Sequence, residues 1–336
     1  MTMKNRLNTP KLVRAAHRGF TLVELMVAMA ITSILVYGIM QITTQGMDLW
    51  KGVREDISTT NNARVALETM CHDLESMQMR AGNNKYQWLL AKADKNKITG
   101  PKGIKIPKSV QCVFFVCAPD RNPAVSSSPS LRRNYRNARA QNIDTQGDVS
   151  AVGYRLMYRD QILQVPGDAR DSEGAYPLFS LYRHVIVPRE TFRQLLGSTD
   201  LGSSYVRYEQ EDENFFLCEN VLEMNLMFNI QYAASKADAA KGLVAYASET
   251  VPVITTSKSG NEKRVEVYGD RIVAGGTTYS NARIVSANVS ITVVTEEGAM
   301  LAEQVRLGRR RAPKPAEFFE KYTRSFSRSV AVPQPL

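Results

Sequence analysis

The sequence lacks the motifs that mark common catalytic and metal sites. Its three histidines are scattered and its four cysteines form no C-x-x-C pair, which excludes the usual zinc spacings. A G-x-S-x-G elbow, a P-loop and an H-E-x-x-H helix are also missing. We therefore expect a protein that holds no metal or cofactor and is not an enzyme.

Acidic residues are lacking at the beginning of the chain. The first nineteen positions hold five basic side chains, Lys4, Arg6, Lys11, Arg14 and Arg18, and not one Asp or Glu. The formal net charge of the whole chain is +10 at pH 7, so half of it lies in this stretch. A second excess of positive charge lies at 306–336, which contains eight Lys and Arg residues and two Glu. Positive charge is therefore local, which excludes a fold that is basic throughout.

Charge is almost absent from the next segment, Phe20–Ile42, where Glu24 is the only charged residue. An α-helix of these 23 residues is about 34 Å long, enough to cross the hydrocarbon core of a membrane. Basic residues before the span predict a cytoplasmic N-terminus and an exported C-terminal body. The run is longer than that of a secretory peptide, and no A-x-A-like cleavage site follows it.

An apolar stripe continues the helical pattern beyond the span. Its members recur mostly at steps of three or four: Leu49, Val53, Ile57, Ala63, Leu67, Met70, Leu74 and Met77. Charged residues lie between them, and we expect these to face water: Asp48, Lys51, Arg54, Glu55, Asp56, Arg64, Glu68, Asp73 and Glu75. Gly82-Asn83-Asn84 is a suitable C-terminal end for this helix. The pattern predicts one helix from Phe20 to about Arg80.

Beyond Gly82 the apolar runs become short and rich in β-branched and aromatic residues. Six of them predict strands: Val110–Val116, Val152–Tyr158, Leu178–Val187, Val221–Tyr232, Arg264–Tyr268 and Ile284–Thr295. A long helix followed by strands predicts an α+β fold, in which the helix packs on an antiparallel β-sheet domain. Two stretches are interpreted as additions to that domain, an Arg-rich surface loop at about 119–150 and an elaboration at about 233–282.

The sequence therefore predicts four parts. They are a basic leader at 1–19, a transmembrane half of the helix at 20–42, an amphipathic half at 43–82 and an exported β-rich domain at 83–336. The protein is expected to cross the membrane once.

The cysteines leave two interpretations open. Cys112 and Cys117 are five positions apart, which places them on opposite faces of a strand and argues against a bond between them. Either one of them forms a disulfide with Cys71 or Cys218 in an oxidising compartment, or all four are free thiols. His72 follows Cys71 directly, and adjacent positions on a helix do not face one another. A catalytic Cys–His pair is therefore not expected.

The heptapeptide RGFTLVE at positions 18–24, followed by the apolar helix, resembles the type III signal of type IV prepilins and pseudopilins. The resemblance implies that a prepilin peptidase cuts between Gly19 and Phe20 and methylates the new N-terminal Phe20. It also implies that an inner-membrane assembly platform stacks the N-terminal helices of several subunits into a filament. The globular domain would then lie in the periplasm.

Several later segments are similar to J-type minor pseudopilins of type II secretion and to PilW-like minor pilins. They are Ala63–Met70 with Asp73-Leu74, Tyr154–Leu156, Leu181–Arg183, Glu219–Val221 leading to Phe228, and Phe326–Val330. Their order along the chain carries this resemblance. It implies a minor subunit at or near the tip of a type II secretion or type IV pilus-like filament, with other pseudopilins or minor pilins as partners.

The presence of Glu24 in the span needs a physical explanation, because placing a carboxylate inside an apolar membrane segment costs free energy. The span contains no Lys, Arg or His to pair with it. Cleavage after Gly19 would create an α-amine on Phe20, and the same amine on a neighbouring subunit is a suitable partner for the Glu24 carboxylate. This predicts that Glu24 acts in assembly. In the alternative, the segment is a plain signal anchor and Glu24 lies among lipid headgroups.

The alternative function is of another class: the protein would be a surface minor pilin that binds DNA or an anionic surface. Basic residues lie beside Tyr135 in the Arg-rich loop and beside four aromatic residues in the tail, Phe318, Phe319, Tyr322 and Phe326. Such mixtures can combine phosphate contact with base stacking. We expect instead that the tail aromatics belong to a last helix and strand packed on the sheet.

Overall fold

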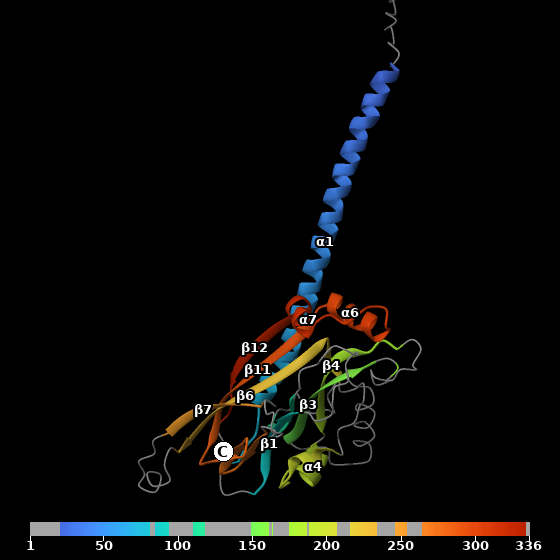
Figure 1. Ribbon diagram of the computed structural model, residues 1–336. Coiled ribbons are helices and arrows are strands. Elements are labelled where there is room, and N and C mark those ends of the chain that lie inside the picture. Colours follow the sequence, from blue (N-terminus) through green and yellow to red (C-terminus); the bar gives the residue numbers. More distant parts are fainter. Residues whose placement is uncertain are drawn as a thin grey trace, which may run out of the picture. The chain divides into compact units, whose positions relative to one another are not determined.

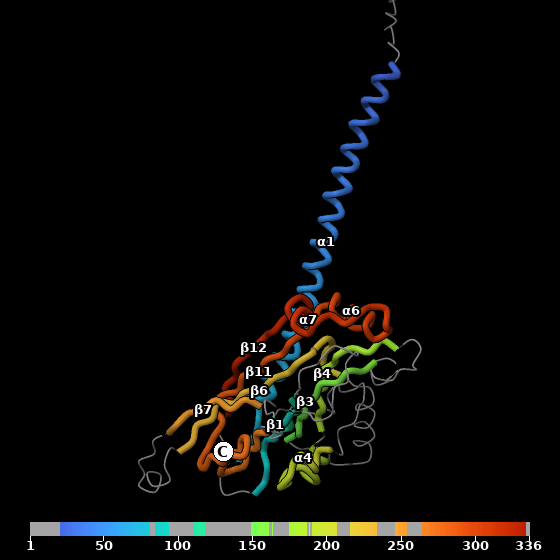
Figure 2. Tube along the Cα trace, in the orientation of Figure 1, coloured from blue at the N-terminus to red at the C-terminus, as the bar shows by residue number. Residues whose placement is uncertain are grey.

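A computed structural model describes most of the chain from Thr21 to Pro333 (Figures 1 and 2). The described ranges are 21–80, 85–93, 110–117, 149–160, 163, 175–186, 188–206, 216–233, 246–253 and 264–333. Contacts divide the chain into two compact units, Met1–Arg54 and Glu55–Leu336. The first helix, α1, covers Leu22–Glu75, so its second part belongs to the same unit as the strands.

The strands of the second unit form two antiparallel sheets. The larger sheet has the order β10-β9-β8-β1-β2-β3-β4-β5 and the smaller one the order β12-β11-β6-β7. The larger sheet contains β1 (Gln87–Ala93), β2 (Val110–Cys117), β3 (Val149–Arg159), β4 (Leu178–Ile186), β5 (Phe216–Glu219), β8 (Val265–Tyr268), β9 (Arg271–Ala274) and β10 (Thr277–Ser280). The smaller sheet contains β6 (Val221–Ala233), β7 (Tyr246–Pro252), β11 (Arg283–Val294) and β12 (Thr323–Ala331). The predicted α+β fold and its six strands are confirmed.

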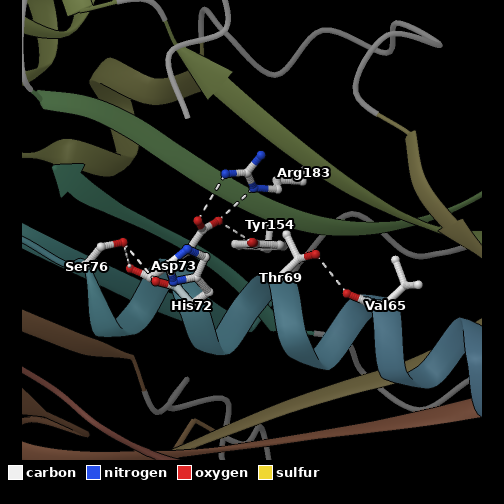
Figure 3. A network of polar contacts seen from close by, with 7 residues as sticks. All are labelled: Val65, Thr69, His72, Asp73, Ser76, Tyr154 and Arg183. Atoms are coloured by element: carbon white, nitrogen blue, oxygen red, sulfur yellow. Dashed lines mark hydrogen bonds and ion pairs between the residues drawn. The ribbon is translucent and has the colours of Figure 1, made fainter. Parts of the chain in front are cut away.

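The C-terminal part of α1 and both sheets share one hydrophobic core. Met70 and Leu74 of α1 are buried together with Tyr154 of the larger sheet and Phe228 and Ile291 of the smaller sheet. Figure 3 shows α1 running between green strands of the larger sheet and orange strands of the smaller one. Burying a large apolar side chain contributes roughly 1.5–3 kcal/mol, so these contacts hold the helix between the sheets.

The outer face of the larger sheet is also covered. A short helical segment crosses it, made of α3 (Pro188–Glu190), the π-helical turn η2 (Thr191–Leu195) and α4 (Leu201–Tyr205). Phe115 of β2 and Leu195 lie in the apolar cluster beneath it. Tyr205 lies directly on Gly153 of β3, where a Cβ atom would be 1.9 Å from the Tyr205 hydroxyl. Both faces of β2 and β3 are therefore buried, which explains their nearly continuous apolar sequences.

Two further helices, α6 (Glu296–Arg306) and α7 (Pro315–Tyr322), join β11 to β12. The hydroxyl of Thr295 accepts a hydrogen bond from the Gly298 N–H at 3.2 Å and so caps α6. Phe318 of α7 is fully buried in a cluster with Tyr158 and Val305. The expected last helix and strand are therefore present, as α7 and β12.

The structure corrects the sequence-based prediction of α1 at two places. The helix ends at Glu75 rather than near Arg80, because the next residues bond to β2: the Gln78 N–H donates to Phe115 O at 2.8 Å. The apolar stripe is buried only in part, since Leu49, Val53 and Ile57 are exposed. Burial of the stripe begins at Ala63. The predicted stop at 82–84 lies outside the described residues.

The stretch at 233–282 was expected to be an elaboration of the domain, and the structure shows that its described parts belong to both sheets. β7 is an edge strand of the smaller sheet, and β8, β9 and β10 complete one side of the larger sheet. The edge strands β7 and β10 give a weak signal because few of their residues are buried. The Arg-rich loop at 119–150 lies outside the described residues except for its end, where β3 has begun.

Removing residues 1–49 is expected to leave a body that folds cooperatively, because the buried part of α1 and both sheets lie in the unit that begins at Glu55. The measurement is urea unfolding followed by far- and near-UV circular dichroism, whose transitions should coincide. A product that binds ANS and lacks near-UV signal would contradict a single core.

Candidate assembly site

The described part of the site begins at Thr21, so the predicted cleavage residues Gly19 and Phe20 lie just outside it. Glu24 Oε2 accepts hydrogen bonds from the Thr21 N–H at 2.9 Å and the Thr21 hydroxyl at 3.0 Å. Thr21 Oγ1 in turn accepts one from the Glu24 N–H at 3.2 Å. This reciprocal arrangement is a capping box, whose T-x-x-E spacing could have been read from the sequence.

The capping box gives Glu24 a role within its own chain that sequence reasoning missed. The two hydrogen bonds that Thr21 donates to the carboxylate use one oxygen, Oε2. A carboxylate offers about four acceptor sites. The capped Glu24 therefore keeps acceptor capacity for a further donor at the start of α1.

The helix that follows is apolar and uncovered. Within the described residues, α1 is the helix long and apolar enough to cross a membrane, and its most apolar window is unburied. Its few polar side chains are satisfied locally: the hydroxyls of Ser33 and Thr43 donate to the carbonyls of Met29 and Ile39, each at 2.8 Å. A helix whose polar groups all bond within the same segment can lie in lipid.

The exposed apolar face extends beyond Ile42, the end of the predicted span. Leu49, Trp50 and Val53 are at least half exposed. The guanidinium of Arg54 lies 5.6 Å from the Trp50 ring centroid, a cation–π contact on the helix surface. The helix thus presents more apolar surface than a single crossing needs.

A second polar site lies in the core, where Asp73 of α1 is fully buried. Figure 3 shows its carboxylate facing Arg183 of β4 and Tyr154 of β3. Arg183 Nε and Nη2 donate to Asp73 Oδ2 at 2.7 Å and to Oδ1 at 3.0 Å, and the Tyr154 hydroxyl donates to Oδ2. The bidentate ion pair compensates the burial of the charge. The expectation that Asp73 faces water is therefore wrong.

Residues 14–39 match a family model described as the prokaryotic N-terminal methylation motif. The chain carries this prepilin-like signal. The matched range contains Gly19, Phe20 and Glu24 and is followed by the rest of the long apolar helix. Searches of the curated proteins and of the solved structures found no match. The methylation motif supports a type IV pilin-like or pseudopilin-like filament subunit, which is a structural protein.

The four cysteines lie in the second unit, outside the methylation motif. In the structure all four are free; Cys71, Cys112 and Cys218 are buried and Cys117 is half-buried. Burial raises the pKa of Cys112 to about 12, which keeps this thiol protonated and unreactive. His72 is exposed beside the buried Cys71, as expected of adjacent helix positions. Among the described residues no group of three or more His, Cys, Asp or Glu is arranged to hold a metal.

The tail aromatics considered for nucleic-acid stacking are used in packing. Phe318 is fully buried, Phe319 and Tyr322 pack against its cluster, and Phe326 packs against the main core. Tyr135 of the Arg-rich loop lies outside the described residues. The four tail rings therefore do not form an open stacking platform.

Proposed function

We propose that the chain is a minor pseudopilin or minor pilin that assembles through α1 into a type II secretion or type IV pilus-like filament, at or near its tip. The observation that carries this proposal is the methylation motif at 14–39, joined directly to a long helix whose apolar side chains are exposed. Other pseudopilins or minor pilins, the prepilin peptidase and an inner-membrane assembly platform are the partners.

The proposed topology follows from the charge distribution. The basic leader stays in the cytoplasm, the helix crosses the inner membrane once, and the body from Glu55 onward lies in the periplasm. The peptidase removes residues 1–19 and methylates Phe20.

Exposure beyond the span favours assembly over a plain anchor. A plain anchor needs apolar side chains only where lipid surrounds it, yet Leu49, Trp50 and Val53 are exposed past Ile42. Large exposed apolar faces mark interaction sites. Packing against the helices of neighbouring subunits would cover these side chains.

The buried network supports the finer resemblance to J-type and PilW-like subunits. Asp73, Tyr154 and Arg183 belong to three segments that the resemblance selected from the sequence alone. In the structure these three side chains meet in one site, although 81 and 110 positions separate the strand residues from Asp73. Three of the resembling segments are therefore joined by one buried network.

Processing tests the proposal directly. In cells that contain a prepilin peptidase, mass spectrometry of the membrane-extracted protein should find a chain that starts at N-methyl-Phe20. Gly19→Val should leave the longer precursor, because a branched side chain obstructs the approach of the backbone to the peptidase.

Ala16→Val, in the same leader, is the matched control and should be processed normally. An intact N-terminus on the unmodified protein, with active peptidase present, would remove the main support for this function.

A further inference from the structure

Three exposed arginines, Arg309, Arg310 and Arg311, lie between α6 and α7. We call residues Gly308–Lys314 the basic turn. Nearby basic residues have acidic partners: Arg306 contacts Glu303 at 2.6 Å and Lys314 contacts Glu317 at 3.8 Å. Among the described residues, no carboxylate forms a salt bridge with the three arginines. Their charge is therefore available to an external partner.

The backbone of the basic turn is ordered by hydrogen bonds. Gly308 has a φ of +70° and its N–H donates to Val305 O at 3.1 Å. The N–H groups of Arg309 and Arg310 both donate to Gln304 O, at 2.9 and 3.2 Å. A left-handed glycine with such bonds is a common helix ending that fixes the direction of the following chain. Hydrogen bonds to the end of α6 thus fix the backbone at Arg309 and Arg310.

Apolar side chains lie beside this charge. Met300 and Leu307 are 47% and 45% exposed. Leu307 is the helical C-cap of α6 and follows Met300 by seven positions, so the two side chains lie on the same side. Basic residues next to exposed apolar ones are typical of surfaces that bind the headgroup region of a membrane.

The basic turn belongs to the end of the second unit where α1 enters it. The Glu55 carboxylate lies close to the start of α6, where partial burial and the nearby carboxylates of Glu296 and Glu297 raise its pKa. Lys321 lies 3.9 Å from Glu297, and Arg310 is close enough to Lys321 to repel it. Ile42, the last residue of the predicted span, is only thirteen positions before Glu55, about 20 Å as a helix. This short connection tethers the first residue of the second unit to the predicted span.

We propose that the basic turn binds the anionic phospholipid headgroups of the membrane that holds α1, before the subunit leaves for the filament. This inference rests on the membrane anchoring in the proposed function. Each arginine near an anionic leaflet favours the bound state roughly fivefold, so three together favour it on the order of a hundredfold. Lipid is favoured over nucleic acid because the neighbouring exposed side chains, Met300 and Leu307, are aliphatic and the tail rings are packed.

The test uses the full chain in nanodiscs of phosphatidylcholine, with or without phosphatidylglycerol, and measures deuterium uptake of the basic turn. Uptake should slow on the order of tenfold when phosphatidylglycerol is present and recover at high salt, which screens the contact. Arg309→Gln/Arg310→Gln/Arg311→Gln should abolish the lipid dependence. The control Arg80→Gln/Lys85→Gln/Arg193→Gln removes equal charge from exposed positions elsewhere and should retain it.

Equal uptake in both lipids, or a lipid dependence that survives in the variant without the three arginines, would overturn the proposal. Protection that grows with protein density in phosphatidylcholine alone would assign the turn to a protein partner instead. Nanodiscs with single chains require no filament, so these results do not depend on assembly. A chain that fails to enter the nanodisc would contradict the anchoring itself.

Discussion

Glu24→Val is expected to leave membrane insertion and cleavage intact and to reduce incorporation into the filament at least about tenfold, because it removes one member of a charge pair in a low-dielectric core. The proposed partner is the Phe20 amine of a neighbouring subunit. A plain anchor predicts the opposite, since removal of a carboxylate from an apolar span improves insertion. Crosslinking to other prepilin-like subunits, scored in the processed membrane fraction, measures incorporation.

Glu24→Gln separates the two roles that the structure gives this side chain. Glutamine retains the capping box with Thr21 but carries no charge, so incorporation should lie between those of wild type and Glu24→Val. Thr32→Val is the matched control in the same span. Its hydroxyl bonds only to the Ala28 carbonyl, and crosslinks should remain at the wild-type level. Undiminished crosslinks for Glu24→Val would refute the assembly role of this carboxylate.

Arg183→Met should destabilise the body by about 3–5 kcal/mol, because it leaves the fully buried Asp73 carboxylate without its cationic partner. The loss is measured by urea unfolding of the detergent-solubilised full chain, monitored through near-UV circular dichroism of the aromatic residues. Tyr154 still donates one hydrogen bond in this variant, but a neutral donor does not compensate the charge.

Asp73→Leu combined with Arg183→Met removes both charges and should be less destabilising than Arg183→Met alone. Arg64→Met is the control, because Arg64 pairs with Glu68 on the exposed side of the same helix at a similar distance of 2.7 Å. Solvent screens that pair, so the stability should not change measurably. An Arg183→Met variant as stable as Arg64→Met would show that the buried pair does not hold α1 on the sheet.

Much of the fold could be predicted because its signals are local. The span at Phe20–Ile42 is a run of apolar residues, and the six predicted strands alternate or cluster β-branched and aromatic side chains. Strands that were not predicted, such as β5 and β10, have four residues each and lie at sheet edges. Their existence depends on the neighbouring strand rather than on their own composition.

The candidate site, like the fold, could be predicted from the sequence only in part. RGFTLVE at 18–24 predicts the processing and assembly residues without a structure, because the signal is a run of adjacent positions within the matched methylation motif. Asp73 could not be recognised as buried, since it follows the pattern of the charged face of α1 and its partners are far away in the chain. The same holds for the basic turn, whose position depends on contacts between α6, α7 and Glu55.

The sequence by itself determined the basic stretch at 1–19, the apolar helix with one carboxylate that follows it, and the presence of strands further along the chain. Hydropathy, charge and side-chain shape determine local structure over a few residues, so these features can be predicted from a single chain segment. Only the tertiary structure decided where α1 stops being exposed, that Asp73 is buried against Tyr154 and Arg183, and that β7 to β10 complete both sheets. Burial of a charge and pairing of edge strands need partners distant in sequence, and only the folded chain brings those partners within hydrogen-bonding distance.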